Sequence, residues 1–342
     1  MLDLVEVTGG DVQHLREGGL AETALTAKLA NPRSDEGLGH VNKRNGVVKA
    51  AFARLADHGL VALSGSVSTK GGPGTGQAAG LGKTMMPVPD PHPDVFDIEW
   101  PLRVADVDRE GRLKFDAATR HIQDIGSDQL REMGFEETHP LWIVRRTMID
   151  LIEPITFKDM LRLRRWCSGT SNRWCDMRVR IEGRRGGLME SEAFWININR
   201  ETQGPARISD DFIAGLQKTT SVNRLRWKAY LKAGGREDAA DVREYPVRVS
   251  DIDIFDHMNN SVYWSVVEDY LLEHPALTAA PLRATIEHDL PVALGDRLEI
   301  VRHVHPAGST DQFGEDLTDR AVTTLTYVVG DEVKAVACLF AL

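Results

Sequence analysis

The densest group of chemically capable side chains in this 342-residue chain lies in one short stretch. It holds Asp253, His257, Asn259 and Asn260 within eight residues. A carboxylate four residues before an imidazole can hold or activate a water molecule, and asparagine is favoured at the start of a helix. The N–H groups of a helix start stabilise negative charge. The stretch could therefore direct water onto a carbonyl carbon and bind the oxyanion that forms.

Two other interpretations of the same residues stay open. An Asp-x-Asp-x-x-x-His pattern can cap a turn, because short polar side chains hydrogen-bond their own backbone. Less often, such a cluster of oxygen and nitrogen ligands binds a metal ion. Since an apolar stretch with helical spacing follows, over residues 262–272, we favour the catalytic interpretation and expect no metal.

The elements that must position these residues occur twice. Val104–Asp108 is echoed by Val249–Asp253 at an offset of 145 residues, and a helical pattern follows each, over 115–125 and 262–272. Ile149-Asp150 is echoed by Ile286-Glu287 at an offset of 137. Each copy closes with strand-like segments, at 177–181 and 193–198, then at 321–329 and 333–340. A long helix and several antiparallel strands, repeated, predict an α+β fold.

Composition divides the chain further. Six glycines between Gly71 and Gly82, followed by prolines at 87, 89, 91 and 93, indicate a linker over residues 71–94. We expect a small helical domain at 1–70, a first repeat at 95–219 and a second at 220–342. In the first repeat Asp106, Asp108 and Asp150 stand at the echoing positions without a following His-x-Asn-Asn, so they are expected to be relics.

The stretch from Asp251 to Tyr263 resembles the D-x-D-x-x-x-H-x-N-N-x-x-Y signature of hotdog-fold thioesterases. Residues 141–148 and 193–197 resemble stretches of the fatty acyl-ACP thioesterase family. The resemblance covers about residues 96–342. It implies a tandem (double) hotdog fold, in which each antiparallel sheet wraps around a long helix. It further implies hydrolysis of an acyl-[acyl carrier protein] thioester without a cofactor, with catalysis in the second hotdog and the acyl-chain pocket shaped by the first.

Two positions depart from that family. An asparagine stands two residues after the catalytic aspartate in the family, whereas this chain has Phe255, and the family's glutamate on the following strand falls at about Pro291. Glu287 lies four residues before Pro291, and an even separation on a strand returns to the same face. Glu287 is therefore a candidate third catalytic residue, with a plain strand residue as the alternative.

Other functions stay open beside the thioesterase. One alternative is an acyl-CoA thioesterase, and another is a non-hydrolytic, acyl-sensing transcriptional regulator, because residues 41–61 resemble part of a winged helix-turn-helix domain. Residues 1–70, however, hold eight basic and eight acidic residues, a poor electrostatic footprint for DNA. DNA binding is therefore the less favoured expectation for this segment.

Net charge and hydropathy limit the kinds of partner that this chain can have. The net charge of −10 disfavours broad nucleic-acid binding, and it means that an acidic carrier protein would need a local basic patch. The basic clusters at 162–165, 184–185 and 224–228 either dock the carrier or lie on a solvated face. With no long apolar stretch and no leader-like start, we expect a cytoplasmic protein that does not insert into membranes; a homodimer is left open.

Overall fold

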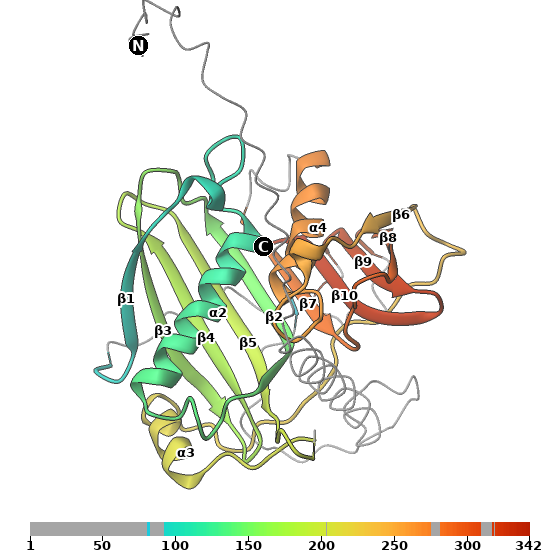
Figure 1. The fold of residues 1–342 in the computed structure, drawn as a ribbon. Coiled ribbons are helices and arrows are strands. Elements are labelled where there is room, and N and C mark those ends of the chain that lie inside the picture. Colours follow the sequence, from blue (N-terminus) through green and yellow to red (C-terminus); the bar gives the residue numbers. More distant parts are fainter. Residues whose placement is uncertain (1–80, 83–91, 203, 275–280, 309–316, 318) are drawn as a thin grey trace, which may run out of the picture. The chain divides into compact units, whose positions relative to one another are not determined.

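The computed structural model describes residues 81–82, 92–202, 204–274, 281–308, 317 and 319–342 (Figure 1). The chain divides into two compact units, Met1–Gly39 and His40–Leu342, and every described residue lies in the second. The domain predicted at 1–70 and most of the linker predicted at 71–94 therefore lie outside the described residues.

Ten strands form one antiparallel sheet whose order shows the internal repeat. The order is β1-β3-β4-β5-β2-β7-β10-β9-β8-β6, so the strands of the second copy repeat those of the first in reverse. β2 and β7 meet at the seam between the copies, in register from Arg146↔Glu287 to Leu151↔Leu282. The strands are β1 Phe96–Pro101, β2 Trp142–Glu153, β3 Met160–Thr170, β4 Trp174–Gly183, β5 Leu188–Asn197, β6 Asp241–Pro246, β7 Leu282–His288, β8 Arg297–His305, β9 Val322–Val329 and β10 Glu332–Ala341.

Each copy contributes one long helix, as the apolar spacing predicts. α2 spans Phe115–Glu132 and lies across β3, β4 and β5 in Figure 1, and α4 spans Asn260–Glu273. A 3₁₀ turn precedes each helix, η1 at Val104–Asp106 and η3 at Val249–Asp251. The offset of 145 residues relates both pairs. A short helix, α3 (Asp210–Leu216), and a 3₁₀ turn, η2 (Gln217–Thr219), follow the first copy. The predicted α+β double hotdog is confirmed.

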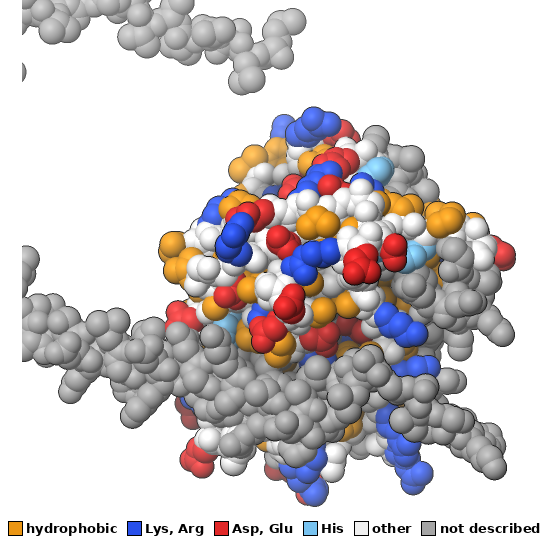
Figure 2. Space-filling view, turned by 90° about the vertical axis from the view of Figure 1, so that its right-hand side faces the viewer, with side chains coloured by type: hydrophobic (Ala, Val, Ile, Leu, Met, Phe, Trp, Pro, Cys, Tyr) orange, Lys and Arg blue, Asp and Glu red, His pale blue; other side chains and the backbone are white. Residues whose placement is uncertain are grey.

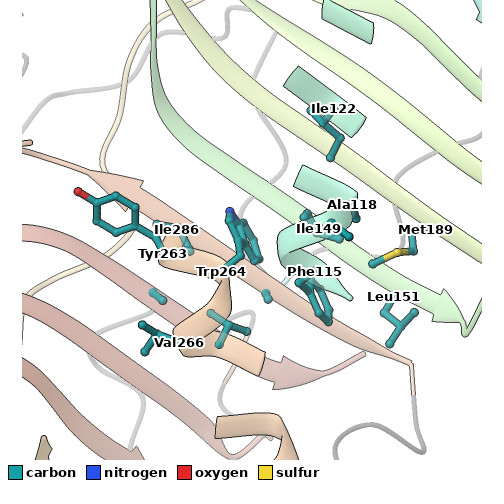
Figure 3. Close-up of a cluster of buried hydrophobic side chains, with 14 of the residues drawn as sticks. Phe115, Ala118, Ile122, Ile149, Leu151, Met189, Tyr263, Trp264, Val266 and Ile286 are labelled. Carbon is teal, nitrogen blue, oxygen red and sulfur yellow. The ribbon is translucent and has the colours of Figure 1, made fainter. Parts of the chain in front are cut away.

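The helices and the sheet share one apolar core. α2 buries Phe115, Ala118 and Ile122 at a spacing of three and four residues, which places them on one helix face. Figure 3 shows Phe115 beside Trp264 of α4, and their stacked rings have centroids 5.7 Å apart. Burial of side chains of this size stabilises a fold by about 1.5–3 kcal/mol each. Within the described residues, no helix is long and apolar enough to span a membrane.

Candidate active site

The catalytic stretch of the sequence forms a tight loop between η3 and α4. A bridge between Ile252 and Met258 closes its neck, and the Asp253 N–H donates to the His257 carbonyl over 2.9 Å. The turn depends on Asp256, which has a φ of 57° and donates its N–H to the Asp253 carbonyl over 2.9 Å. Aspartate tolerates this left-handed conformation better than most residues. The loop thereby brings Asp253 and His257 together across its neck.

Two hydrogen bonds position the Asp253 carboxylate, and burial raises its pKa. One oxygen accepts from the Phe255 N–H at 2.9 Å, and the other accepts from the Asn259 amide at 3.3 Å. Partial burial raises the pKa of Asp253, although these hydrogen bonds oppose the shift. Asp251 has a different role, because it accepts the Arg248 N–H at 2.9 Å and caps η3. Of the two aspartates in the motif, only Asp253 lines the cavity described below.

The start of α4 supplies hydrogen-bond donors beside Asp253. Asn259 caps the helix, since its side-chain oxygen accepts from the Ser261 N–H at 2.9 Å. The N–H of Asn260, the first helical residue, donates no hydrogen bond to any described residue, so it is available to an oxyanion. From the first hotdog, the Gln123 amide on α2 reaches the Asn259 oxygen at 3.4 Å. Gln123 was missed by the sequence analysis, because only packing of α2 against α4 brings it here.

A cavity of about 310 Å³ joins this loop to the interior of the first hotdog. Four predicted residues line it: Asp253, His257, Asn259 and Asn260. It lies where the two copies diverge, because pairing of β2 with β7 stops at Arg146 and Glu287. Its inner part is largely apolar, with a lining that includes Leu130, Met133, Cys175, Met177, Trp195, Phe212 and Leu216. Polar groups at one end and apolar walls beyond are typical of a site for an apolar chain with a reactive head.

Glu287, the third predicted catalytic residue, is not placed at this cavity. It lies on the opposite face of β7 from Ile286, and its carboxylate pairs with Arg146 at 3.0 Å and accepts the Tyr230 and Leu231 N–H groups. The prediction assumed regular alternation as far as Pro291, but β7 ends at His288.

The internal repeat accounts for the Glu287 ion pair. The offset of 137 residues that relates Asp150 to Glu287 also relates Arg146 to Arg283, and Asp150 pairs with Arg283 at 2.6 Å. The two pairs are thus equivalent across the seam. All four side chains are nearly inaccessible, with at most 6% of any of them exposed. Their placement indicates a role in holding the two hotdogs together.

The residue after Glu287 faces the cavity instead. His288 shares the parity of Ile286, lines the cavity and packs edge-on against Tyr263 at 4.8 Å. Burial, reinforced by the nearby Arg145 guanidinium, lowers the pKa of His288 to about 3, so its ring is neutral at physiological pH. Arg145 also donates to the His288 carbonyl and, at 3.0 Å, to the Asp289 carboxylate, which fixes this wall of the cavity.

Two of the three echoing aspartates of the first copy, Asp106 and Asp108, bind the backbone of turns, whereas the third, Asp150, is in the buried pair with Arg283. Asp106 accepts the Arg103 N–H at 3.0 Å, and Asp108 binds the Arg112 backbone and guanidinium at 2.9 Å. For the part of the chain described, there is no group of three or more His, Cys, Asp or Glu residues that could hold a metal ion.

The basic cluster at 162–165 is split by the alternation of β3. Arg162 pairs with Asp97, and Arg164 pairs with Glu182 at 2.6 Å. Arg165 is half-buried, points to the other face of the strand and lines the cavity, so it does not share the exposed face of Arg162 and Arg164. On the face shown in Figure 2, acidic and basic side chains are interspersed rather than gathered by sign.

Two tandem hotdogs with a carboxylate, an imidazole and a helix start at the mouth of an apolar cavity define a thioester hydrolase. Comparison with known proteins specifies the family. The acyl-ACP thioesterase N-terminal domain matches residues 93–216, and the acyl-ACP thioesterase C-terminal domain matches residues 234–342. The chain belongs to the acyl-ACP thioesterase family. Both matches describe the enzyme, and neither supports the regulator left open by the sequence.

The chain is also similar to two uncharacterized relatives and, in fold, to solved structures. The chain is 39% identical over 245 residues to the uncharacterized proteins MT2057 and Rv2001 of Mycobacterium tuberculosis, covering 72% of this chain and 91% of each relative. Its fold is similar to an acyl-ACP thioesterase from Bacteroides thetaiotaomicron, with 17% identity, a TM-score of 0.57 and coverage of 72% and 97%. It is also similar to the 12:0-ACP thioesterase from Umbellularia californica, with 17% identity, a TM-score of 0.56 and coverage of 72% and 93%.

Proposed function

We propose that Asp253 is the general base of acyl-ACP hydrolysis and that the start of α4 is the oxyanion site. The observation that carries this proposal is the convergence of Asp253, His257 and the Asn260 N–H on one end of a single apolar cavity. A base with a pKa raised by burial is better matched to proton transfer near neutral pH than an exposed aspartate is.

The proposed reaction has two steps. Asp253 takes a proton from a water molecule while the water oxygen bonds to the thioester carbonyl carbon. The carbonyl oxygen becomes an oxyanion, which the Asn260 N–H and the positive end of α4 stabilise. The C–S bond then breaks, and the thiolate takes the proton from Asp253, leaving a fatty acid and the carrier thiol. His257 hydrogen-bonds either the carboxylate or the thioester and so positions one against the other.

The acyl chain occupies the part of the cavity inside the first hotdog. Side chains from α2, β4 and α3 wall this part, among them Leu130, Met177 and Leu216. Each methylene group transferred there from water contributes about 0.8 kcal/mol to binding. That energy holds the thioester carbonyl beside Asp253.

A basic stripe beside the site is the proposed carrier contact. Arg224, Arg226 and Lys228 are exposed on an extended segment, in alternation with Leu225 and Trp227, which pack inward. The same apolar cluster contains Phe255 of the catalytic loop and Leu290, so the stripe flanks the site. An acidic carrier protein complements such a surface despite the net charge of −10.

The test is release of free thiol from matched acyl-ACP and acyl-CoA substrates. We expect hydrolysis of acyl-ACP with a higher kcat/KM than that of acyl-CoA. A preference for acyl-CoA would contradict the carrier contact, and hydrolysis of neither substrate across a range of chain lengths would contradict the proposed function.

A further inference from the structure

Arg165 is a charged side chain on the helix-facing side of the first hotdog. Its neighbours on that face of β3, Leu163 and Cys167, are buried against apolar side chains of the core. Its guanidinium lies against α2, where a Cβ added to Gly126 would be 3.5 Å from the Arg165 Nη2. Arg165 itself is half-buried and lines the cavity. An arginine placed among apolar side chains usually has a partner that offsets its charge.

The described surroundings do not offset the charge of Arg165. One of its N–H groups donates to the Gln129 side-chain oxygen, and no carboxylate of the described residues lies within ion-pair distance. Cys167 and Cys175 are close, but burial raises the pKa of Cys167 to about 12 and also raises the pKa of Cys175, so both thiols are neutral. Burial lowers the pKa of Arg165 only to about 10, which leaves the side chain cationic at neutral pH.

Arg165 lines the same cavity as Asp253, and contacts along α2 indicate how far it lies from the reactive end. Gln123 contacts Asn259 at the reactive end, and Gln129 contacts Arg165. Six residues of α-helix separate Gln123 from Gln129, a rise of about 9 Å along the helix axis. An extended chain advances about 1.2 Å per bond, so about seven or eight bonds span the interval.

We propose that Arg165 binds a carboxylate at the far end of the acyl chain, so that the substrate class includes ω-carboxyacyl thioesters of about eight carbons. The proposal rests on the proposed function, since it assigns the cavity to the acyl group. A carboxylate neutralises the guanidinium and matches its fork of N–H donors. A methyl-ended chain of that length would bring only apolar atoms to the charge. Arg165 is therefore a specificity-determining residue rather than a catalytic one.

The experiment compares octanoyl and suberoyl (ω-carboxy, eight-carbon) thioesters on the same carrier. The wild-type protein should prefer the suberoyl thioester in kcat/KM by at least ~10-fold, the scale of a buried charge-assisted contact, and Arg165→Met should abolish or reverse the preference. Arg164→Met is the matched control, because Arg164 lies on the opposite face of β3 in a pair with Glu182. It should keep the wild-type preference.

A binding measurement separates this proposal from the proposed function. Suberate should raise the Tm of the wild-type protein more than octanoate does, and Arg165→Met should lose that difference. If octanoyl-ACP is hydrolysed but the suberoyl thioester is not preferred, the Arg165 proposal is overturned while the thioesterase stands. If neither thioester is hydrolysed, the proposed function fails, and the Tm difference between suberate and octanoate still decides the Arg165 proposal.

Discussion

Replacement of Glu287 by Gln separates a structural carboxylate from a catalytic one. The variant leaves Arg146 without its counter-charge in a place where the two side chains are only 5% and 6% exposed. Breaking a buried pair from one side costs about 3–5 kcal/mol. Because glutamine keeps an oxygen that can accept the Tyr230 and Leu231 N–H groups, we expect the lower part of that range, about 3–4 kcal/mol. In a chain of this size that is a fall in Tm of roughly 5–15 °C.

Asp150→Asn is the matched control, since Asp150 is the equivalent of Glu287 across the repeat and pairs with Arg283 at 2.6 Å. Thermal unfolding followed by circular dichroism measures both variants, and kcat is measured well below either Tm. Both variants should lose stability to a similar extent while kcat is unchanged. A Glu287→Gln protein with a wild-type Tm and a kcat lowered ~10²-fold, the scale of a lost acid–base group, would refute the structural assignment.

Three further predictions follow from the charges of the site and of its surroundings. Since burial raises the pKa of Asp253 and the base must be ionised, kcat/KM should fall as pH decreases through that raised pKa, and a profile flat down to pH 4 would contradict this role. Glu268 lies on α4, and burial raises its pKa to about 7, so the folded protein keeps a proton that the unfolded chain loses near pH 4.5. The free energy of unfolding should therefore decline from about pH 4.5 to pH 7, and Glu268→Gln should reduce that slope in denaturant titrations at each pH. Arg226→Glu should raise KM for acyl-ACP but leave KM for a small acyl thioester without the carrier unchanged, and equal effects on both substrates would argue against a docking role.

The sequence predicted those parts of the molecule that depend on local pattern. The 145-residue offset and the apolar spacing predicted the two corresponding helices, α2 and α4, because this spacing repeats within a few turns of chain. Asp253, His257, Asn259 and Asn260 were found because all four lie within eight consecutive residues. Their catalytic roles, and the winged-helix interpretation of residues 1–70, stay predictions.

The remaining residues of the cavity come from other helices and strands. Whether their side chains face the cavity depends on helix packing and on where each strand ends. Gln123 and His288 reach the cavity only through packing of α2 and the ending of β7. Arg165 shows that some of this information was present in the chain: in Arg164-Arg165 on a strand, one of two consecutive side chains must face inward. For Glu287 the sequence rule failed. The alternation of side chains was extended to Pro291, beyond the end of β7 at His288, and it therefore assigned Glu287 to the wrong face.

The most direct test of the central claim is the rate of acyl-ACP hydrolysis by Asp253→Asn compared with wild type. Asparagine keeps an oxygen that can accept the Phe255 N–H, now at 2.9 Å, so the loop should stay folded and the Tm should change little. The predicted result is a kcat lowered at least ~10²-fold with KM nearly unchanged. Wild-type turnover by the folded variant would contradict the assignment of Asp253 as the catalytic base.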